Sequence, residues 1–248
     1  MLYSLGAVPY LNALPLIHYL SEKPRLEAPA ALARLLRIGQ IDIATAPIVT
    51  YFENPYTLVP GICIGSNGPV KSVKLFFTKT GINIQNVQSI YLDMESRTSI
   101  LLLKVLLQFK YGRRLDEITF YHPLPPRDCE AKLLIGDKTM KEISENPSLD
   151  LGEEWTQWTG KPFVYAAWLS RLPEVSEKAI QELTLARDQG CNNIPSVIPM
   201  NPPLPTAAIQ DYLKKNLIFR LGSAEREGME LFRDYLLRAE LLQSKSAA

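Results

Sequence analysis

Short apolar strand segments alternate with helical segments along most of the chain, and this alternation limits the fold more than any other feature. Strands are predicted at 2–8, 41–46, 58–64 and 70–78, with a helix at 29–38. A second unit near Asn86 has strands at 89–93, 118–121 and 131–135 around a helix at 98–109. That helix is apolar on nearly every side, so we expect it to be buried against a sheet. The pattern predicts an α/β protein with a small parallel sheet in its second unit.

The order of the segments predicts two lobes. The first unit is incomplete when the second begins, and the helices at 175–189 and 223–242, after Leu169, need a surface to pack on. We therefore predict a discontinuous lobe one at 1–85 and 166–248 and a lobe two at 86–165, with crossings near 79–88 and 161–168. Two lobes joined by two crossings form a hinged cleft that suits a small ligand. The segment 194–205 carries five prolines and is predicted to be irregular, with no assigned role.

Composition and charge exclude several classes of protein. The net charge of +1 gives no support for a nucleic-acid or membrane partner. No apolar run is long enough to cross a bilayer, and the N-terminus lacks the basic region and cleavage site of a signal peptide. Three widely spaced cysteines suit a reducing compartment, so we expect a cytoplasmic protein with free thiols. The sequence does not predict the oligomeric state.

The segment 93–99, DMESRTS, carries the clearest signal for a binding site because it joins a strand to the buried helix. Free backbone N–H groups at a helix N-terminus attract anions. Ser96, Thr98 and Ser99 add hydroxyl groups, and Arg97 could bind a carboxylate with two hydrogen bonds. An ordinary Ser or Thr N-cap with Arg97 in solvent explains the segment equally well at this stage.

Three further segments are candidates for the cleft. Gly65–Pro69, with Ser66, Asn67 and Gly68, can approach a ligand closely or can be an ordinary turn. Tyr10 and Asn12 stand between two prolines at the first strand-to-helix turn, where Asn12 binds a ligand or caps a helix. Gly136 and Asp137 follow the strand at 131–135, and a helix cap over 138–145 is the favoured role of Asp137.

Other kinds of chemistry find little support in the sequence. His18 and His122 are the only histidines, and no metal-ligand spacing, phosphate-binding loop or Ser-His-Asp arrangement is present. We predict neither a metal nor another cofactor. Anion binding and hydrogen bonding remain, without an obvious strong base.

Five stretches in the same order resemble the chorismate dehydratases of the futalosine route to menaquinone. They are VPYLNALPL, GQIDIATAPIVTYFENPYTLVPGICIGSNGPVKSVKLFF, LDMESRTSILLLKVLL, LLIGD and DLGEEWTQWTGKPFVYAAW. The resemblance spans about Leu5 to Leu169, and the Tyr-Leu-Asn and Ser-Arg-Thr-Ser pieces are the most specific. It implies the type II periplasmic-binding-protein-like fold, two α/β lobes around a central cleft. It also implies a hydro-lyase that removes water from chorismate to give 3-[(1-carboxyvinyl)oxy]benzoate.

The resemblance also assigns roles to the candidate residues. Asn12 and Arg97 would be the catalytic pair, with Asn12 near the hydroxyl that leaves. The two carboxylates of chorismate would lie at the helix N-terminus and at the glycine turn. The other substrate-binding residues would be Tyr10, Ser66, Asn67, Gly68, Ser96, Thr98, Ser99, Gly136 and Asp137. Because no His or Glu stands out in these motifs, we hypothesise that a substrate carboxylate accepts the proton.

Three alternatives stay open. A non-enzymatic protein that binds small carboxylates would share the fold. The 1,4-dihydroxy-6-naphthoate synthase is the alternative enzyme, but it typically opens with a Ser-Pro-Cys-Pro-Asn type motif, and this chain has VPYLN at 8–12. The ligand domain of a transcriptional regulator is the third, although no DNA-binding segment precedes it.

Overall fold

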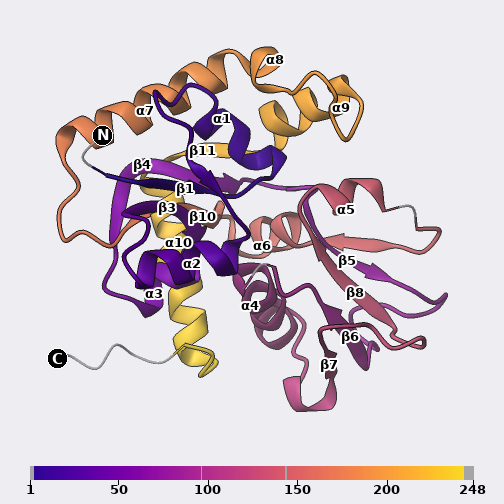
Figure 1. Ribbon diagram of the computed structural model, residues 1–248. Helices are drawn as coiled ribbons and strands as arrows, with labels where there is room; N and C mark the ends of the chain where they lie inside the picture. Colours follow the sequence, from indigo (N-terminus) through magenta and orange to yellow (C-terminus); the bar gives the residue numbers. More distant parts are fainter. Residues whose placement is uncertain (1–2, 96, 143, 243–248) are drawn as a thin grey trace.

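The computed structural model describes residues 3–95, 97–142 and 144–242 and contains two β-sheets, each with its own helices (Figure 1). The first sheet has six strands in the order β11-β4-β10-β3-β1-β2. Strand β1 is parallel to β2 and β3, whereas β10 is antiparallel to β3 and β4, and β11 is antiparallel to β4. The strands are β1 (Leu5–Ala7), β2 (Arg25–Leu26), β3 (Ile43–Pro47), β4 (Thr57–Ser66), β10 (Phe163–Ser170) and β11 (Ile218–Leu221).

The second sheet has five strands in the order β7-β6-β8-β5-β9. Strand β6 is parallel to β7 and β8, but β5 is antiparallel to β8 and β9, so the predicted parallel sheet is in fact mixed. The strands are β5 (Val73–Phe77), β6 (Ser89–Leu92), β7 (Thr119–Tyr121), β8 (Ala131–Ile135) and β9 (Ser148–Asp150).

Strand β5 belongs to the second sheet, although the predicted boundary at residue 85 placed it in lobe one. The chain leaves the first sheet at Ser66 and passes through Lys71, whose φ of 62° turns the backbone sharply. Val73 then pairs with Ile135. The first crossing therefore lies at 67–72, and the return crossing lies just before β10. As a division into domains, the lobe boundaries stay a prediction.

Helices cover both sheets (Figure 1). Helices α1 and α7 lie on one side of the first sheet, and α2, α3 and α10 lie on the other, while α4 and α6 lie beside the second sheet. Their bounds are α1 (Leu14–Ile17), α2 (Pro29–Arg37), α3 (Ile48–Glu53), α4 (Arg97–Val105), α5 (Asp137–Lys141), α6 (Leu151–Thr159), α7 (Glu177–Asn192), α8 (Ile194–Val197), α9 (Thr206–Asp211) and α10 (Ser223–Arg238). Helix α4 is buried over most of its length, as its sequence predicted.

Four short segments of the described chain form 3₁₀ or π-helical turns. A 3₁₀ turn, η1 (Leu11–Ala13), precedes α1, and another, η3, covers Leu115–Glu117. Helices α4 and α9 each continue into a π-helical turn, η2 (Leu106–Lys110) and η4 (Tyr212–Asn216). Part of the segment predicted to be irregular forms the single-turn helix α8, with Pro195 in its first turn, where proline is compatible with a helix.

The two lobes share a packed aromatic junction away from the cleft. Trp155 of α6 packs on Phe163 of β10 and Phe232 of α10, with ring centroids 5.3 and 5.9 Å away. Gly228 of α10 belongs to this junction, because a Cβ there would lie 2.0 Å from the carbonyl oxygen of Pro162. Glycine in this helix therefore permits close packing at the return crossing, which offsets its low helix propensity.

The first crossing is tied to α6 by one buried carboxylate. Asp150 caps α6 by accepting hydrogen bonds from the backbone N–H groups of Gly152 and Glu153. It also accepts from the backbone N–H groups of Val70 and Lys71, at 2.9 and 2.6 Å. One side chain thus fixes both the start of α6 and the segment that enters the second sheet.

Candidate active site

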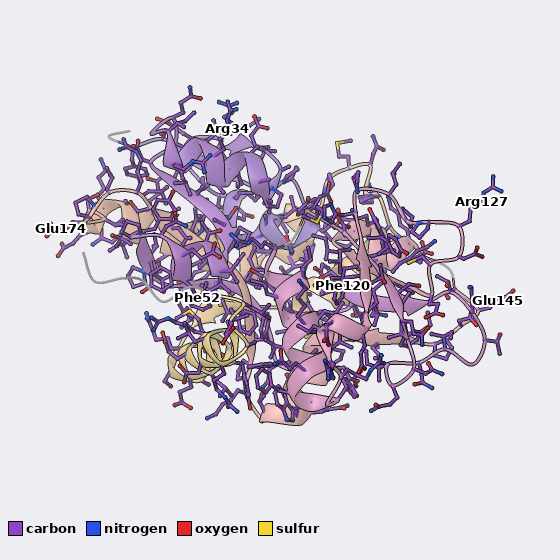
Figure 2. The ribbon with its side chains drawn as sticks, turned by 90° about the horizontal axis from the view of Figure 1, so that it is seen from below. Arg34, Phe52, Phe120, Arg127, Glu145 and Glu174 are labelled. Carbon is purple, nitrogen blue, oxygen red and sulfur yellow. The ribbon has the colours of Figure 1, made fainter. Side chains whose placement is uncertain are left out.

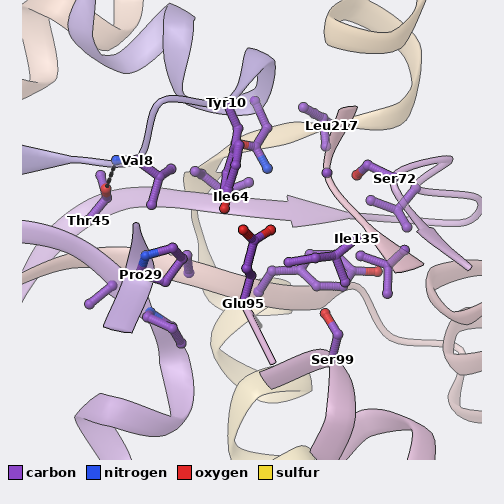
Figure 3. A pocket seen from close by; sticks show the side chains of 18 residues that line it. Val8, Tyr10, Pro29, Thr45, Ile64, Ser72, Glu95, Ser99, Ile135 and Leu217 are labelled. Carbon is purple, nitrogen blue, oxygen red and sulfur yellow. Dashed lines mark hydrogen bonds between the residues drawn. The ribbon is translucent and has the colours of Figure 1, made fainter. Parts of the chain in front are cut away.

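A cavity lies between the two sheets, and residues of both lobes line it (Figure 3). It encloses about 630 Å³ of empty space, open solvent at its mouth included. We call it the central cavity. Its polar lining side chains are Tyr10, Asn12, Thr45, Ser72, Glu95, Ser99 and Tyr165. The rest of its lining is mainly apolar: Val8, Pro29, Ala46, Pro47, Ile64, Val70, Val73, Ile135, Gly136, Ala166 and Leu217.

Tyr10 reaches from the first strand-to-helix turn across to the second lobe. Its ring packs on Gly136, where a Cβ would be 3.8 Å from the Tyr10 ring. Gly136 has φ 71° and ψ −156°, a conformation that in effect only glycine adopts. The tyrosine side chain and the Glu95 carboxylate face one another across the cavity (Figure 3). Burial, followed by the charge and hydrogen bonding of Glu95, raises the pKa of Tyr10 to about 12.

Asp137 makes a second contact between the lobes, and its predicted role as a helix cap is wrong. The N-cap of α5 is Gly136, without a side-chain cap, and the helix ends at Lys141 rather than at 145. The Asp137 carboxylate instead accepts a hydrogen bond of 3.3 Å from the backbone N–H of Leu11. Its pKa is raised by burial, against the lowering effects of that N–H group and Lys141. Tyr10 and Leu11 therefore hold the N-terminal turn against lobe two.

Asn12 lines the central cavity from the 3₁₀ turn η1 and caps no helix. The N-caps of η1 and α1 are Tyr10 and Ala13, and neither turn has a side-chain cap hydrogen bond. The Asn12 amide interacts with Tyr212. Burial raises the pKa of Tyr212 and outweighs the lowering effect of Asn12. The Tyr212 hydroxyl in turn lies 2.8 Å from Ser72 Oγ.

The side-chain oxygen of Asn12, Oδ1, is buried and has no hydrogen-bond partner among the described residues. Buried polar atoms are nearly always paired, and a buried acceptor left unpaired costs about 1–3 kcal/mol. An acceptor in a cavity wall that no protein group satisfies is available to a ligand.

The predicted anion site at the start of α4 is divided between two surfaces. Ser99 lines the central cavity. Thr98 is fully buried, and its Oγ1 has no partner among the described residues. Arg97 forms an ion pair with Glu53 of α3 and lies outside the central cavity, with 60% of its side chain exposed. Ser96, the fourth member of this predicted group, lies outside the described residues.

The glycine turn also lies behind the cavity wall rather than in it. Ser66 Oγ is fully buried, 3.4 Å from the hydroxyl of Tyr165, which does line the cavity. Asn67 is exposed. The backbone N–H of Gly68 donates to Thr156 Oγ1 at 2.9 Å, which ties the turn to α6. In this structure the turn supports the cavity through Tyr165.

Four polar side chains of the lining were not predicted from the sequence: Thr45, Ser72, Glu95 and Tyr165. Glu95 could have been found, because it lies in the strand-to-helix segment already selected for its hydroxyl groups. Thr45 and Tyr165 lie inside strands that read as continuous apolar runs, and nothing local marks them. Ser72 becomes a lining residue only because the first crossing folds over the cavity.

Glu95 is the single charged side chain among the described lining residues. Lys138 Nζ lies 2.9 Å from Glu95 Oε2 and also pairs with the buried Asp93. The lining therefore offers hydroxyl and amide groups, with no guanidinium or ammonium group of its own. Within 3–95, 97–142 and 144–242, no cluster of three or more His, Cys, Asp or Glu residues suits a metal ion, and no helix could span a membrane.

Comparison with known proteins assigns the family. The pattern of a family described as menaquinone biosynthesis matches residues 3–238. The chain belongs to the menaquinone biosynthesis family. It is 30% identical to a chorismate dehydratase of Thermus thermophilus, over 94% of this chain and 95% of that protein. It is 27% identical to a chorismate dehydratase of Campylobacter jejuni, over 92% and 94% of the two chains.

Solved structures confirm the fold predicted for this member of the family. A protein from Archaeoglobus fulgidus superposes with a TM-score of 0.71 at 12% identity, over 97% of this chain and 98% of that one. The periplasmic aliphatic sulphonate-binding protein of Escherichia coli superposes with a TM-score of 0.64 at 15% identity, over 98% and 94%. The chain thus has the two-lobed, periplasmic-binding-protein-like α/β fold, with the central cavity between its lobes.

Proposed function

We propose that this protein is a chorismate dehydratase, a hydro-lyase that converts chorismate to 3-[(1-carboxyvinyl)oxy]benzoate for menaquinone biosynthesis. The observation that carries the proposal is the central cavity, where hydroxyl, amide and carboxyl side chains line a mainly apolar space between the lobes. A cyclohexadiene ring with a hydroxyl group and two carboxylates needs such a mixture. Two relatives named for this activity, matched over more than nine-tenths of the chain, support it.

The residues of the cavity suit an elimination. The C–H bond beside the enol ether breaks and its electron pair forms the new ring double bond. The neighbouring hydroxyl leaves as water, taking up the proton that the C–H bond released. The step involves no net oxidation or reduction, so it needs no redox cofactor. Because the ring becomes aromatic, placing the groups correctly can supply much of the catalysis.

We assign Asn12 to the hydroxyl that leaves, since its buried Oδ1 can accept a hydrogen bond from that hydroxyl and orient it. Ser99, in the first turn of α4, suits one substrate carboxylate. Ser72 and Tyr165 are candidates for the enolpyruvyl arm, in place of the glycine turn behind them. The ring of Tyr10 would cover the substrate from the N-terminal turn.

We propose further that a substrate carboxylate accepts the proton. Glu95 is the competing acceptor, since it lies in the lining. Its carboxylate is already engaged by Lys138 and by Tyr10, which disfavours that role. Glu95→Gln should keep the contact with Tyr10 and remove a charge that repels a dianion, so turnover should persist within about tenfold. A variant that binds chorismate normally but does not turn it over would assign the proton to Glu95.

The activity itself is tested by incubating the purified protein with chorismate and recording the mass spectrum over time. A product lighter by one water, with the ultraviolet absorption of an aromatic ring and formed faster than without protein, is the expected result. Chorismate that is bound but unchanged, seen as a raised melting temperature, would instead favour a carboxylate-binding protein.

We also propose a cytoplasmic location and a small molecule as the only partner needed for activity. The thiols of Cys63, Cys129 and Cys191 are free, which suits a reducing compartment.

A further inference from the structure

The central cavity poses an electrostatic problem for the proposed substrate. Chorismate carries two carboxylates, and the single charged side chain in the described lining is the acidic Glu95. Neutral donors can hold a carboxylate once it has arrived, but they exert little attraction over distance. The attraction must therefore come from charges outside the lining.

A second, polar pocket lies beside the central cavity and is rich in arginine. Its lining comes from α2, α3, the following loop and the start of α4: Ala30, Ala33, Arg34, Arg37, Thr50, Glu53, Asn54, Tyr56 and Arg97. It encloses about 650 Å³, open solvent included. We call it the arginine pocket.

Residues that are neighbours in the chain line the two spaces. Pro29, the first residue of α2, lines the central cavity, and the next residue, Ala30, lines the arginine pocket. On the other lobe, Glu95 lines the central cavity and Arg97, two residues later, lines the arginine pocket. On this side of the central cavity, an approaching ligand would pass the arginines.

Two of the three arginines have no acidic partner in the part of the chain that the structure describes. Arg97 pairs with Glu53, but Arg34 and Arg37 have no hydrogen-bond or ion-pair partner among the described residues. Three arginines and one glutamate thus line the pocket, which carries a net positive charge. Arg34 and Arg37 lie in the last turn of α2, one turn apart, where cations also interact favourably with the helix dipole.

We propose that Arg34, Arg37 and Arg97 form an entrance site that captures the carboxylates of the substrate and directs it into the central cavity. This inference rests on the proposed function. The ligand class is a small dicarboxylate, and Arg97 exchanges its partner, Glu53, for a ligand carboxylate. Positive charge at the rim of a cleft raises the rate of anion association, and salt screens the effect.

The test compares the Arg34→Gln/Arg37→Gln variant with wild type across ionic strength. At low salt we expect kcat/KM for chorismate to fall by about three- to tenfold while kcat stays unchanged. At about 0.5 M salt, where screening is strong, the difference should shrink below about twofold. A matched control is Lys79→Gln/Arg127→Gln, which removes two exposed cations from the second lobe; Figure 2 places Arg34 and Arg127 on opposite lobes. The control should behave as wild type.

Three results would overturn the proposal: an unchanged kcat/KM, a loss that does not depend on salt, or an equal loss in the control. An altered melting temperature with unchanged kcat/KM would mean that the arginines only stabilise the end of α2. If wild type does not turn over chorismate, the proposed function fails, and the entrance site is tested by chorismate binding. Salt-dependent weakening of binding in the double variant would then support it, and equal binding would refute it.

Discussion

Replacing Asn12 by alanine should remove activity while leaving stability nearly unchanged. In the folded protein the Asn12 amide interacts with Tyr212, a contribution of about 1 kcal/mol to the free energy of unfolding. Its Oδ1 is buried without a partner, at a cost of about 1–3 kcal/mol. These effects have opposite signs. We therefore expect the free energy of unfolding to change by no more than about 2 kcal/mol.

The effect on catalysis should be much larger. If Oδ1 orients the hydroxyl that leaves, its loss misplaces the reacting group, and such misplacement costs about 100-fold in rate. That factor equals about 2.7 kcal/mol of activation free energy. The assay is the initial rate of aromatic product formation at saturating chorismate, paired with urea unfolding of the same preparation.

Asn216→Ala is a matched control for this variant. Asn216 also has a buried Oδ1 without a described partner, and its Nδ2 donates to the carbonyl oxygen of Pro69 at 2.8 Å. It does not line the central cavity. Its replacement should therefore leave kcat within about twofold, with a similarly small effect on stability. The reasoning would be refuted if Asn12→Ala kept its activity, or if it unfolded more than about 3 kcal/mol more easily.

Three other variants test the contacts around the cavity. Gly136→Ala must place a side chain at φ 71° and ψ −156°. We therefore expect urea unfolding to show a loss of about 1–3 kcal/mol in the free energy of unfolding. A variant as stable as wild type would contradict the strain assigned to this position. Asp137→Asn should gain stability relative to wild type between about pH 3.5 and pH 7. Because the pKa of Asp137 is raised in the folded protein, wild type loses stability as the pH rises and the carboxyl group ionises. Asparagine still accepts the hydrogen bond from Leu11 and cannot ionise. A stability difference with the opposite pH dependence in urea unfolding would refute this. Asp150→Ala leaves four backbone N–H groups without their acceptor, and calorimetry should show a destabilisation of about 2–4 kcal/mol; a loss below about 1 kcal/mol would contradict this role.

Much of the architecture could be predicted because it depends on local patterns. The α/β class and the buried helix α4 follow from the spacing of apolar residues, and α2 lies at Pro29–Arg37, within a residue of its predicted range. The membership of β5 could not be predicted this way. A strand's apolar pattern shows that it is buried, but it does not show which sheet buries it.

The candidate site could likewise be predicted only in part. Strand-to-helix turns select the segments around Tyr10, Ser99 and Gly136, and all three residues line the central cavity. The direction of each side chain within a segment depends on distant neighbours. Arg97 turns away to Glu53, and Glu95, two residues earlier, enters the cavity.

The sequence by itself therefore determined the kind of fold and the turns at which a ligand could bind. Only the tertiary structure decided which atoms of those turns face the ligand. The physical reason is that the deciding contacts join residues far apart in the chain. The hydrogen bond from Leu11 to Asp137 spans 126 residues, and the contact between Asn12 and Tyr212 joins the N-terminal turn to the C-terminal part of lobe one. Such contacts form only when distant parts of the chain have folded together, so no local pattern records them.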